Sequence, residues 1–496
     1  MTETRTNDSS KLLYRLLGGT MYTGIGVGFS TVAGIVSTKI LAMYLPSTEF
    51  GHAVLIELVA TFLRMVSGLS IGVAAIRSLT QVKREEQNTI VDTVVIFRFI
   101  TFVLISLVFL VTQRWVYWIF GEEPVENLTF LILGFTLVLA YQTVLKQMLQ
   151  GFFQFKRMAL IDLGASILTP VMLAIFLIWF KVGLAGAVLS RIIATGVACL
   201  FFYLALPTKK GLSFRLSTLI EMLRFSWPLQ VNEIVTFIHR SFGTLVVATV
   251  MTPADVALLA IAGKIPTNFQ RMYEAFRTVY FPNLSSLLAQ RDYRRAQKML
   301  NATLRGVTFL MTACTVLAFV FQREIILTFY SEQYLGTGMI FVLLMLATTI
   351  EMSTYVLGNS TVAAGNSKAP AVVNTLNTII TVCGNLTLVP LLGTVGAVWT
   401  RIVTRIMTNP VNVWFLRKSG LIPRARDYVK PITLFGILYA LFLWLQPTSL
   451  LVRLLFLLAF FAASFLLSIV TLQDIRVLWN SLMQLWGKRL RKRLAR

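Results

Sequence analysis

Long apolar stretches recur along the whole chain and are separated by short polar connections. Because about 20 apolar residues in helical form cross a bilayer core, each stretch of that length predicts one membrane-spanning helix. The fourteen spans predicted in this way are 14–41, 48–76, 89–113, 126–150, 157–180, 183–206, 218–250, 254–287, 296–321, 335–364, 369–390, 394–416, 429–446 and 450–473. The pattern therefore predicts an all-α polytopic membrane protein.

The composition agrees with this prediction. The 496 residues are 56% apolar and only 13% charged, whereas about a quarter of the residues in a soluble domain are charged. The net charge of +24 does not indicate nucleic-acid binding, because the basic residues lie mostly between the spans, where membrane topology requires them. With two histidines and three cysteines, all three inside apolar runs, we expect no disulfide framework, metal site or cofactor.

Lysine and arginine are concentrated in alternate connections, and basic connections stay on the cytoplasmic side of a membrane. The rich set holds Arg77, Lys83, Arg84, Lys156, Arg157, Lys209, Lys210, Arg215, Arg291, Arg294, Arg295, Lys298, Lys368, Arg417, Lys418, Arg424, Arg426 and Lys430, whereas the poor set holds Arg114, Lys181, Arg323 and Arg453. The N-terminal segment 1–13 and the amphipathic tail 474–496 are also basic. We therefore predict that both termini are cytoplasmic and that the tail lies on the anionic membrane surface. The first span is too long for a signal peptide, so we expect it to be retained.

The chain offers no sign of enzymatic chemistry. The longest predicted external loops, 114–125 and 322–334, are about a dozen residues each, so no external domain holds catalytic residues. We find no phosphate-binding glycine loop, catalytic triad or ligand cluster with metal spacing. The sequence thus favours a transporter over a glycan polymerase or ligase.

Two pairs of segments match between the predicted halves. Residues 183–192 (GLAGAVLSRI) resemble 393–402 (GTVGAVWTRI), and 45–49 (LPSTE) resembles 251–255 (MTPAD) at nearly the same offset. A duplication of six spans in the same orientation explains both matches, although small-residue patterns also recur in unrelated membrane helices. The predicted organisation is a cytoplasmic N-terminus at 1–13, an N-lobe at 14–206, a linker at 207–217, a C-lobe at 218–416, two further spans within 429–473 and the tail at 474–496.

Charged residues inside the spans carry the functional prediction. Glu233 and Arg240 are seven residues apart, as are Lys264 and Arg271, and seven residues are about two helical turns, so each pair shares a helix face. Charges at bilayer depth are costly and normally face a wet cavity or a partner. The spans hold eleven basic residues, Arg64, Arg98, Lys146, Arg191, Arg240, Lys264, Arg271, Arg277, Arg305, Arg401 and Arg405, against five acidic residues, Glu57, Asp162, Glu233, Glu274 and Glu351.

Pairing within the spans cannot neutralise this surplus, so we predict a cationic cavity that accepts an anionic substrate. The predicted substrate-binding residues are Arg64, Arg98, Arg240, Lys264, Arg271, Arg277 and Arg305. The five acids are candidates for ion coupling or charge balance. The alternative, charges paired for packing alone, remains open and is favoured for Lys146, Arg191 and Arg405. For His239 we expect a packing role.

The layout resembles the oligosaccharide flippases of the polysaccharide transporter family, within the multidrug/oligosaccharidyl-lipid/polysaccharide (MOP) exporter superfamily. The segments that carry the resemblance are 45–51 (LPSTEFG), 264–266 (KIP) through 281–285 (FPNLS), 363–368 (AAGNSK) and 393–397 (GTVGA). The resemblance implies two six-helix lobes in a V, with two extra C-terminal helices that help to hold a lipid tail. It implies a bacterial inner membrane protein that moves an undecaprenyl-diphosphate-linked glycan to the periplasmic leaflet by alternating access, for synthesis of O-antigen, exopolysaccharide or capsule.

The same resemblance implies that cavity arginines contact the diphosphate or acidic sugars and that an ion gradient, of H⁺ or Na⁺, drives transport. Membrane lipids and the polysaccharide polymerase machinery are the implied partners. Two alternatives stay open at this point. One is a flippase for the lipid-linked peptidoglycan precursor, which also uses a cationic cavity; the other is a multidrug or metabolite cation antiporter, which needs an acid-dominated one.

Overall fold

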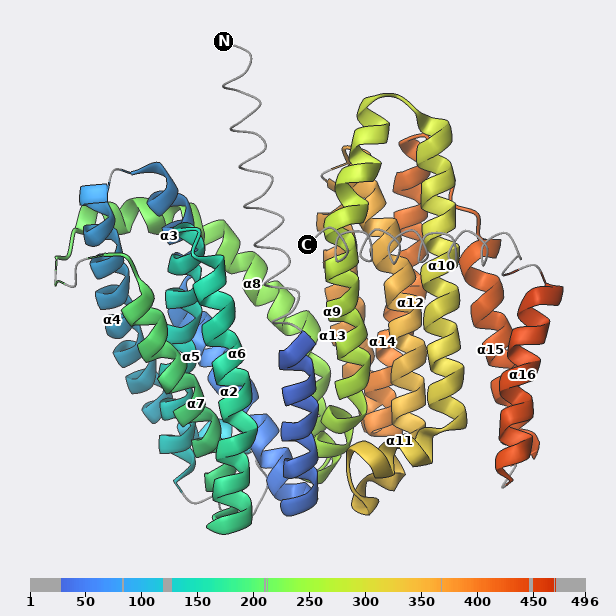
Figure 1. Ribbon diagram of the computed structural model, residues 1–496, viewed down its shortest axis with the longest axis horizontal. Coiled ribbons are helices and arrows are strands. Elements are labelled where there is room, and N and C mark those ends of the chain that lie inside the picture. The colour runs from blue at the N-terminus through green and yellow to red at the C-terminus, as the bar shows by residue number, and fades with distance from the viewer. Residues whose placement is uncertain are drawn as a thin grey trace, which may run out of the picture. The chain divides into compact units, whose positions relative to one another are not determined.

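A computed structural model describes residues 28–82, 84–118, 127–208, 211, 213–366, 368–445, 449–467 and 469. The described part is all-α (Figure 1). A first helix spans Gly28–Tyr44. The further elements are α2 (Ser47–Gly68), α3 (Ile71–Gln81), α4 (Arg84–Tyr117), α5 (Leu128–Gly151), α6 (Phe155–Ala174), η2 (Ile175–Trp179), α7 (Gly183–Ala205), α8 (Leu216–Val250), α9 (Pro253–Ala289), α10 (Tyr293–Val320), α11 (Gln322–Phe329), η3 (Glu332–Thr337), α12 (Gly338–Ala363), α13 (Lys368–Leu392), α14 (Thr394–Lys418), α15 (Arg426–Leu445) and α16 (Leu450–Leu466).

Helices overlap every predicted span, and the all-α polytopic fold is confirmed. Within the described residues, nine helices are long and apolar enough to cross a membrane. Helices α9 and α14 are not among these nine, and both carry charges along their length, Lys264 and Arg271 in α9 and Arg401 and Arg405 in α14. The predicted N-terminal segment and basic tail lie outside the described residues.

The structure corrects the prediction at two places. The span predicted at 48–76 is broken between α2 and α3, because Leu69 and Ser70 adopt left-handed backbone conformations with φ of 45° and 49°. Non-glycine residues rarely adopt such angles, so tertiary contacts must hold them there. The external connection predicted at 322–334 is largely helical, forming α11 and the first half of η3. Its residues Ile326, Tyr330 and Tyr334 are buried in a hydrophobic cluster.

Contacts between residues divide the chain into two compact units. Unit 1 comprises 1–264, 326–337 and 378–400. In unit 1, α5 packs against α2, α3 and α7, and α7 also packs against α6. Apolar residues of these helices form the core, for example Ile56 and Ile132, neither of which is exposed to solvent.

Unit 2 comprises 265–325, 338–377 and 401–496. Helix α12 packs against α10, which also packs against α15 and α16 (Figure 1). Although α12 is almost entirely buried, it carries several hydroxyl side chains, which donate hydrogen bonds to carbonyl oxygens four residues earlier in the same helix; these are Thr348, Thr349, Ser353 and Thr354. Such bonds satisfy the hydroxyl groups within the helix. Thr349 and Ser353 also hydrogen-bond to Thr315 and Thr308 of α10, so polar contacts link α12 to α10.

The segments matched in sequence have matching local structures. Gly183 and Gly393 both have left-handed backbones, with φ of 64° and 60°, and each stands at the start of a helix. Ser47 and Pro253 likewise begin α2 and α9. The start of α2 contacts the start of α9, because Gly51 lies directly against the backbone carbonyl of Pro253. The arrangement of the helices in two six-span lobes stays a prediction.

Candidate functional site

Each of the five candidate acids has a basic partner in the described part of the chain. Glu57 pairs with Arg191, and Asp162 pairs with Lys146 at 2.5 Å. Glu274 pairs with Arg277 at 3.1 Å, three residues away on α9. The remaining two acids, Glu233 and Glu351, belong to larger networks described below. All five candidate acids are therefore engaged by cations of the chain itself.

The break between α2 and α3 is held by a polar network from α8. The Ser70 hydroxyl lies 2.9 Å from Oε2 of Glu233 and 3.0 Å from Oε1 of Gln230. The Gln230 amide donates to the carbonyl oxygen of Met65 at 3.1 Å, and the other carboxylate oxygen of Glu233 lies 3.7 Å from Arg64. A hydroxyl has only one proton, so Ser70 donates to one of its two acceptors at a time. The network explains how Ser70 is kept in a strained conformation.

Arg98 on α4 supports the same break from the other side. Its Nη2 donates to the carbonyl oxygen of Arg64 at 2.8 Å, near the C-terminal end of α2, where a cation is favoured by the helix dipole. Arg98 is only 1% exposed, and its Nε and Nη1 have no hydrogen-bond partner in the described structure. Arg98 is therefore buried where it supports the backbone at Arg64, and its side chain is not exposed for binding a ligand.

We expect Arg98→Met to destabilise the protein by about 1.5–3 kcal/mol, the usual worth of a hydrogen bond that involves a charged group. The loss arises because the carbonyl groups at the end of α2 lose their cationic donor. Thermal unfolding of the purified protein in detergent measures it, with the exposed Arg224→Met on α8 as the matched control. An unchanged melting temperature for Arg98→Met would show that the break does not depend on this side chain.

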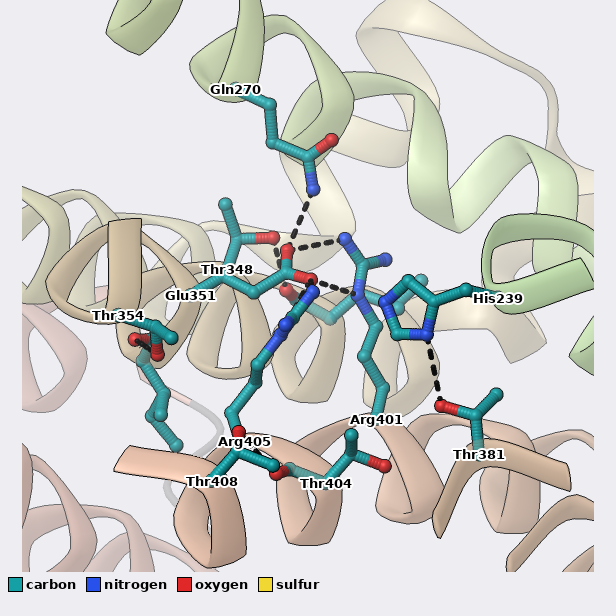
Figure 2. Close-up of polar contacts among 12 residues, drawn as sticks. His239, Gln270, Thr348, Glu351, Thr354, Thr381, Arg401, Thr404, Arg405 and Thr408 are labelled. Atoms are coloured by element: carbon teal, nitrogen blue, oxygen red, sulfur yellow. Dashed lines mark hydrogen bonds and ion pairs between the residues drawn. The ribbon is translucent and has the colours of Figure 1, made fainter. Parts of the chain in front are cut away.

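The most buried charge cluster surrounds Glu351 of α12, whose side chain is 4% exposed. Nη2 of Arg401 lies 2.6 Å from Oε2 of this carboxylate, and Nη2 of Arg405 lies 2.8 Å from Oε1. The Gln270 amide of α9 donates to Oε2 at 2.7 Å. Figure 2 shows the carboxylate between this amide and the two guanidinium groups. The guanidinium carbon of Arg405 also lies 5.8 Å from the centre of the Tyr355 ring, a cation–π distance.

This cluster was missed as a unit by the sequence analysis. Glu351 was predicted as a candidate acid and Arg405 as a helix-packing residue, but no contact between them was predicted. The spacing of Arg401 and Arg405, four residues apart and so on one helix face, was the available signal. Their partner, however, lies about fifty positions away in the sequence, and no local pattern identifies it.

The other predicted cations occupy different environments. Arg240 and Arg271 are exposed, and neither forms an ion pair or hydrogen bond with a described residue. Lys264 and Arg305 are partly buried and each has an interaction with the protein. The prediction for His239 concerned packing, and its Nδ1 lies 3.2 Å from the Thr381 hydroxyl (Figure 2). Arg240 and Arg271 are therefore the predicted binding residues most available to an anion.

Comparison with known families identifies the chain. A family model described as "Polysaccharide biosynthesis protein" matches residues 40–338, which is more than half of the sequence. The chain belongs to the polysaccharide biosynthesis protein family. The resemblance stated from the sequence is thus confirmed at the level of the family. No curated protein gives a significant match.

Solved structures show that this polysaccharide biosynthesis protein has the fold of MOP superfamily transporters. "Lipid II flippase MurJ, inward closed conformation" is similar with a TM-score of 0.71 and 14% identity, over 89% of this chain and 97% of that one. An inward-facing multidrug resistance MATE family transporter gives 0.63 and 16%, over 79% and 94%. A MOP superfamily transporter from Pyrococcus furiosus, described as having a binding pocket of reverse polarity, gives 0.55 and 15%, over 82% and 95%. At these identities the similarity concerns the fold alone.

Proposed function

We propose that the protein is a flippase that moves an anionic undecaprenyl-diphosphate-linked oligosaccharide from the cytoplasmic to the periplasmic leaflet of a bacterial inner membrane. Membership of the polysaccharide biosynthesis protein family and a multi-pass MOP fold support this proposal. The observation that carries it is the charge balance inside the spans. The five acids are paired with cations of the chain, whereas Arg240 on α8 and Arg271 on α9 are exposed cations.

In the proposed mechanism, the diphosphate and the acidic sugars bind to exposed cations of the spans in a cationic cavity, while the lipid tail stays in the bilayer. Arginine suits this role because its planar fork binds two phosphate oxygens at once. The lobes then rock, and the cavity opens to the periplasmic side. Both termini stay cytoplasmic, as the distribution of lysine and arginine predicts.

The buried residues take supporting roles in this proposal. Arg98 positions the end of α2, and thereby Arg64, instead of touching the substrate. Glu351 is held as a carboxylate by two arginines, so it balances charge. Glu233 is our candidate for ion coupling, because its contact with Arg64, at 3.7 Å, is longer than the ion pairs of the other four acids.

We expect Arg240→Ala and Arg271→Ala each to lower export of the surface polysaccharide by about tenfold, and the double variant by more, since a charged hydrogen bond is worth about 1.5–3 kcal/mol. The assay measures surface glycan in cells that lack the chromosomal copy, at matched protein levels. Arg294→Ala, an exposed arginine of α10 outside the predicted cavity, is the matched control. Full export by the double variant would refute the cavity proposal.

A flippase for the lipid-linked peptidoglycan precursor is the second candidate, and the similarity in fold to the MurJ structure favours it. Complementation separates the two functions. If the gene restores growth to cells depleted of their peptidoglycan-precursor flippase, but does not restore surface polysaccharide to an export mutant, the second candidate is correct. The cation antiporter remains disfavoured, because it requires a surplus of free acids within the spans.

A further inference from the structure

A cavity of about 720 Å³ lies in unit 2, where the connection between α12 and α13 meets the end of α14 and the start of α10. The described residues that line it are Tyr293, Ala364, Gly365, Asn366, Lys368, Lys418, Ser419 and Gly420. Four of them belong to the segment 363–368, which helped to carry the family resemblance but has no role in the proposed transport step. Both lysines lie in connections that we predict to be cytoplasmic.

Two similar helix ends form the walls of this cavity. Gly365 and Gly420 have left-handed backbones, with φ of 86° and 81°. The N–H of Asn366 donates to the carbonyl of Thr361 at 3.2 Å, and the N–H of Leu421 donates to that of Leu416 at 3.1 Å. This pattern is the Schellman motif, which satisfies the last carbonyl groups of a helix. Both α12 and α14 thus end in compact turns that expose backbone and short polar side chains to the cavity.

The charges in the cavity are unbalanced. Lys418 is favourably placed in the last turn of α14, but Lys368 is the first residue of α13, where a cation is disfavoured by the helix dipole. Among the described lining residues none is acidic. The neighbouring Asp292 is engaged with Arg295, at 3.4 Å. The cavity therefore concentrates positive charge, and a bound anion would offset the unfavourable interaction of Lys368 with the N-terminal end of α13.

An apolar slot of about 580 Å³ lies in the same unit and is lined in part by Trp414. The Nζ of Lys418 lies 3.7 Å from the centre of the Trp414 ring, so one aromatic ring contacts the lysine and also lines the slot. Arg417 lies at the slot as well. The remaining lining residues are Ile350, Ile406, Asn409, Pro410, Val413, Tyr428, Val429, Ile432 and Thr433. A cationic cavity next to an apolar slot is suited to an amphipathic anion and not to a free phosphate.

We propose that the two cavities together bind one resident anionic phospholipid. Its phosphodiester group contacts Lys368 and Lys418, and an acyl chain occupies the slot beside Trp414. Lysines near the cytoplasmic surface attract anionic lipids, and tryptophan is favoured at the level of lipid headgroups. This lipid is distinct from the transported substrate, so the inference does not rest on the proposed function.

The test is native mass spectrometry of the detergent-purified protein titrated with phosphatidylglycerol. We expect the wild type to bind one lipid tightly and Lys368→Gln/Lys418→Gln to bind it about thirtyfold more weakly, as the loss of two cations near a lipid headgroup predicts. Lys298→Gln, an exposed lysine of α10 outside the cavity, is the matched control and should bind as the wild type does. Val413→Trp, which fills the slot but keeps both lysines, should also lose the lipid.

Three further probes identify the ligand class. Zwitterionic phosphatidylcholine should bind weakly, because it has no net negative charge. Glycerol 3-phosphate, which lacks an acyl chain, should not displace bound phosphatidylglycerol. Displacement by glycerol 3-phosphate at equal concentration would overturn the lipid in favour of a soluble phosphate. Preferential binding of undecaprenyl phosphate would overturn the resident phospholipid in favour of a substrate-related lipid. Equal binding of phosphatidylglycerol by the wild type and the double lysine variant would overturn the site itself.

Discussion

Glu351→Gln should destabilise the protein by about 3–5 kcal/mol, the usual cost of removing one partner of a buried ion pair. The neutral amide leaves Arg405, with a side chain only 7% exposed, and Arg401 without a counter-charge. Unfolding of the purified protein in detergent, followed by heat or by denaturant, measures the loss. Glu332→Gln, at an exposed acid of η3, is the matched control and should change stability by less than about 0.5 kcal/mol.

A second variant makes this prediction specific to the cluster. Replacing Glu351, Arg401 and Arg405 together by glutamine removes all three charges, so part of the lost stability should return. If Glu351→Gln is instead as stable as the wild type but does not export glycan, Glu351 acts in ion coupling and not in charge balance. Measurement of both stability and export therefore decides between the two roles that the sequence left open for this residue.

Gly51→Ala should also be strongly destabilising, by about 3 kcal/mol or more, beyond the usual range for overpacking. A methyl group at this position of α2 would overlap the backbone carbonyl of Pro253 at the start of α9. The obstacle is backbone and cannot rotate away, so the two helix starts would have to separate. Reduced expression in the membrane and a lower melting temperature in detergent are the expected results.

Gly164→Ala on α6 and Gly306→Ala on α10 are the controls for this variant, because an added methyl group meets no atom within 4 Å at either place. Alanine favours helix by up to about 1 kcal/mol over glycine, so both controls should be as stable as the wild type or more stable. Similar losses at Gly51 and at the controls would mean that the contact between the repeated segments is not responsible.

Two findings illustrate how tertiary contacts altered the predicted elements. The apolar pattern at 48–76 is continuous and predicts one helix. The helix is interrupted at Ser70, whose hydroxyl hydrogen-bonds with Gln230 and Glu233, about 160 positions away. The segment 322–334 is short and carries several charges, so it resembles a loop in sequence. It folds as helix because Tyr330 and Tyr334 pack against apolar residues near Leu41 and Leu173. In both cases a long-range contact outweighs the local preference.

The sequence by itself determined the all-α membrane fold, the approximate positions of most long helices, the resemblance to the family and the surplus of positive charge. These properties follow from the length of the apolar stretches, their local periodicity and the composition, all of which can be read from the sequence. Only the tertiary structure decided that Glu351 is held between Arg401 and Arg405, that Arg98 is buried behind Arg64, and that Arg240 and Arg271 are exposed. The physical reason is that the helix period fixes which residues share a face, whereas the helix that packs against that face is selected by contacts between distant parts of the chain.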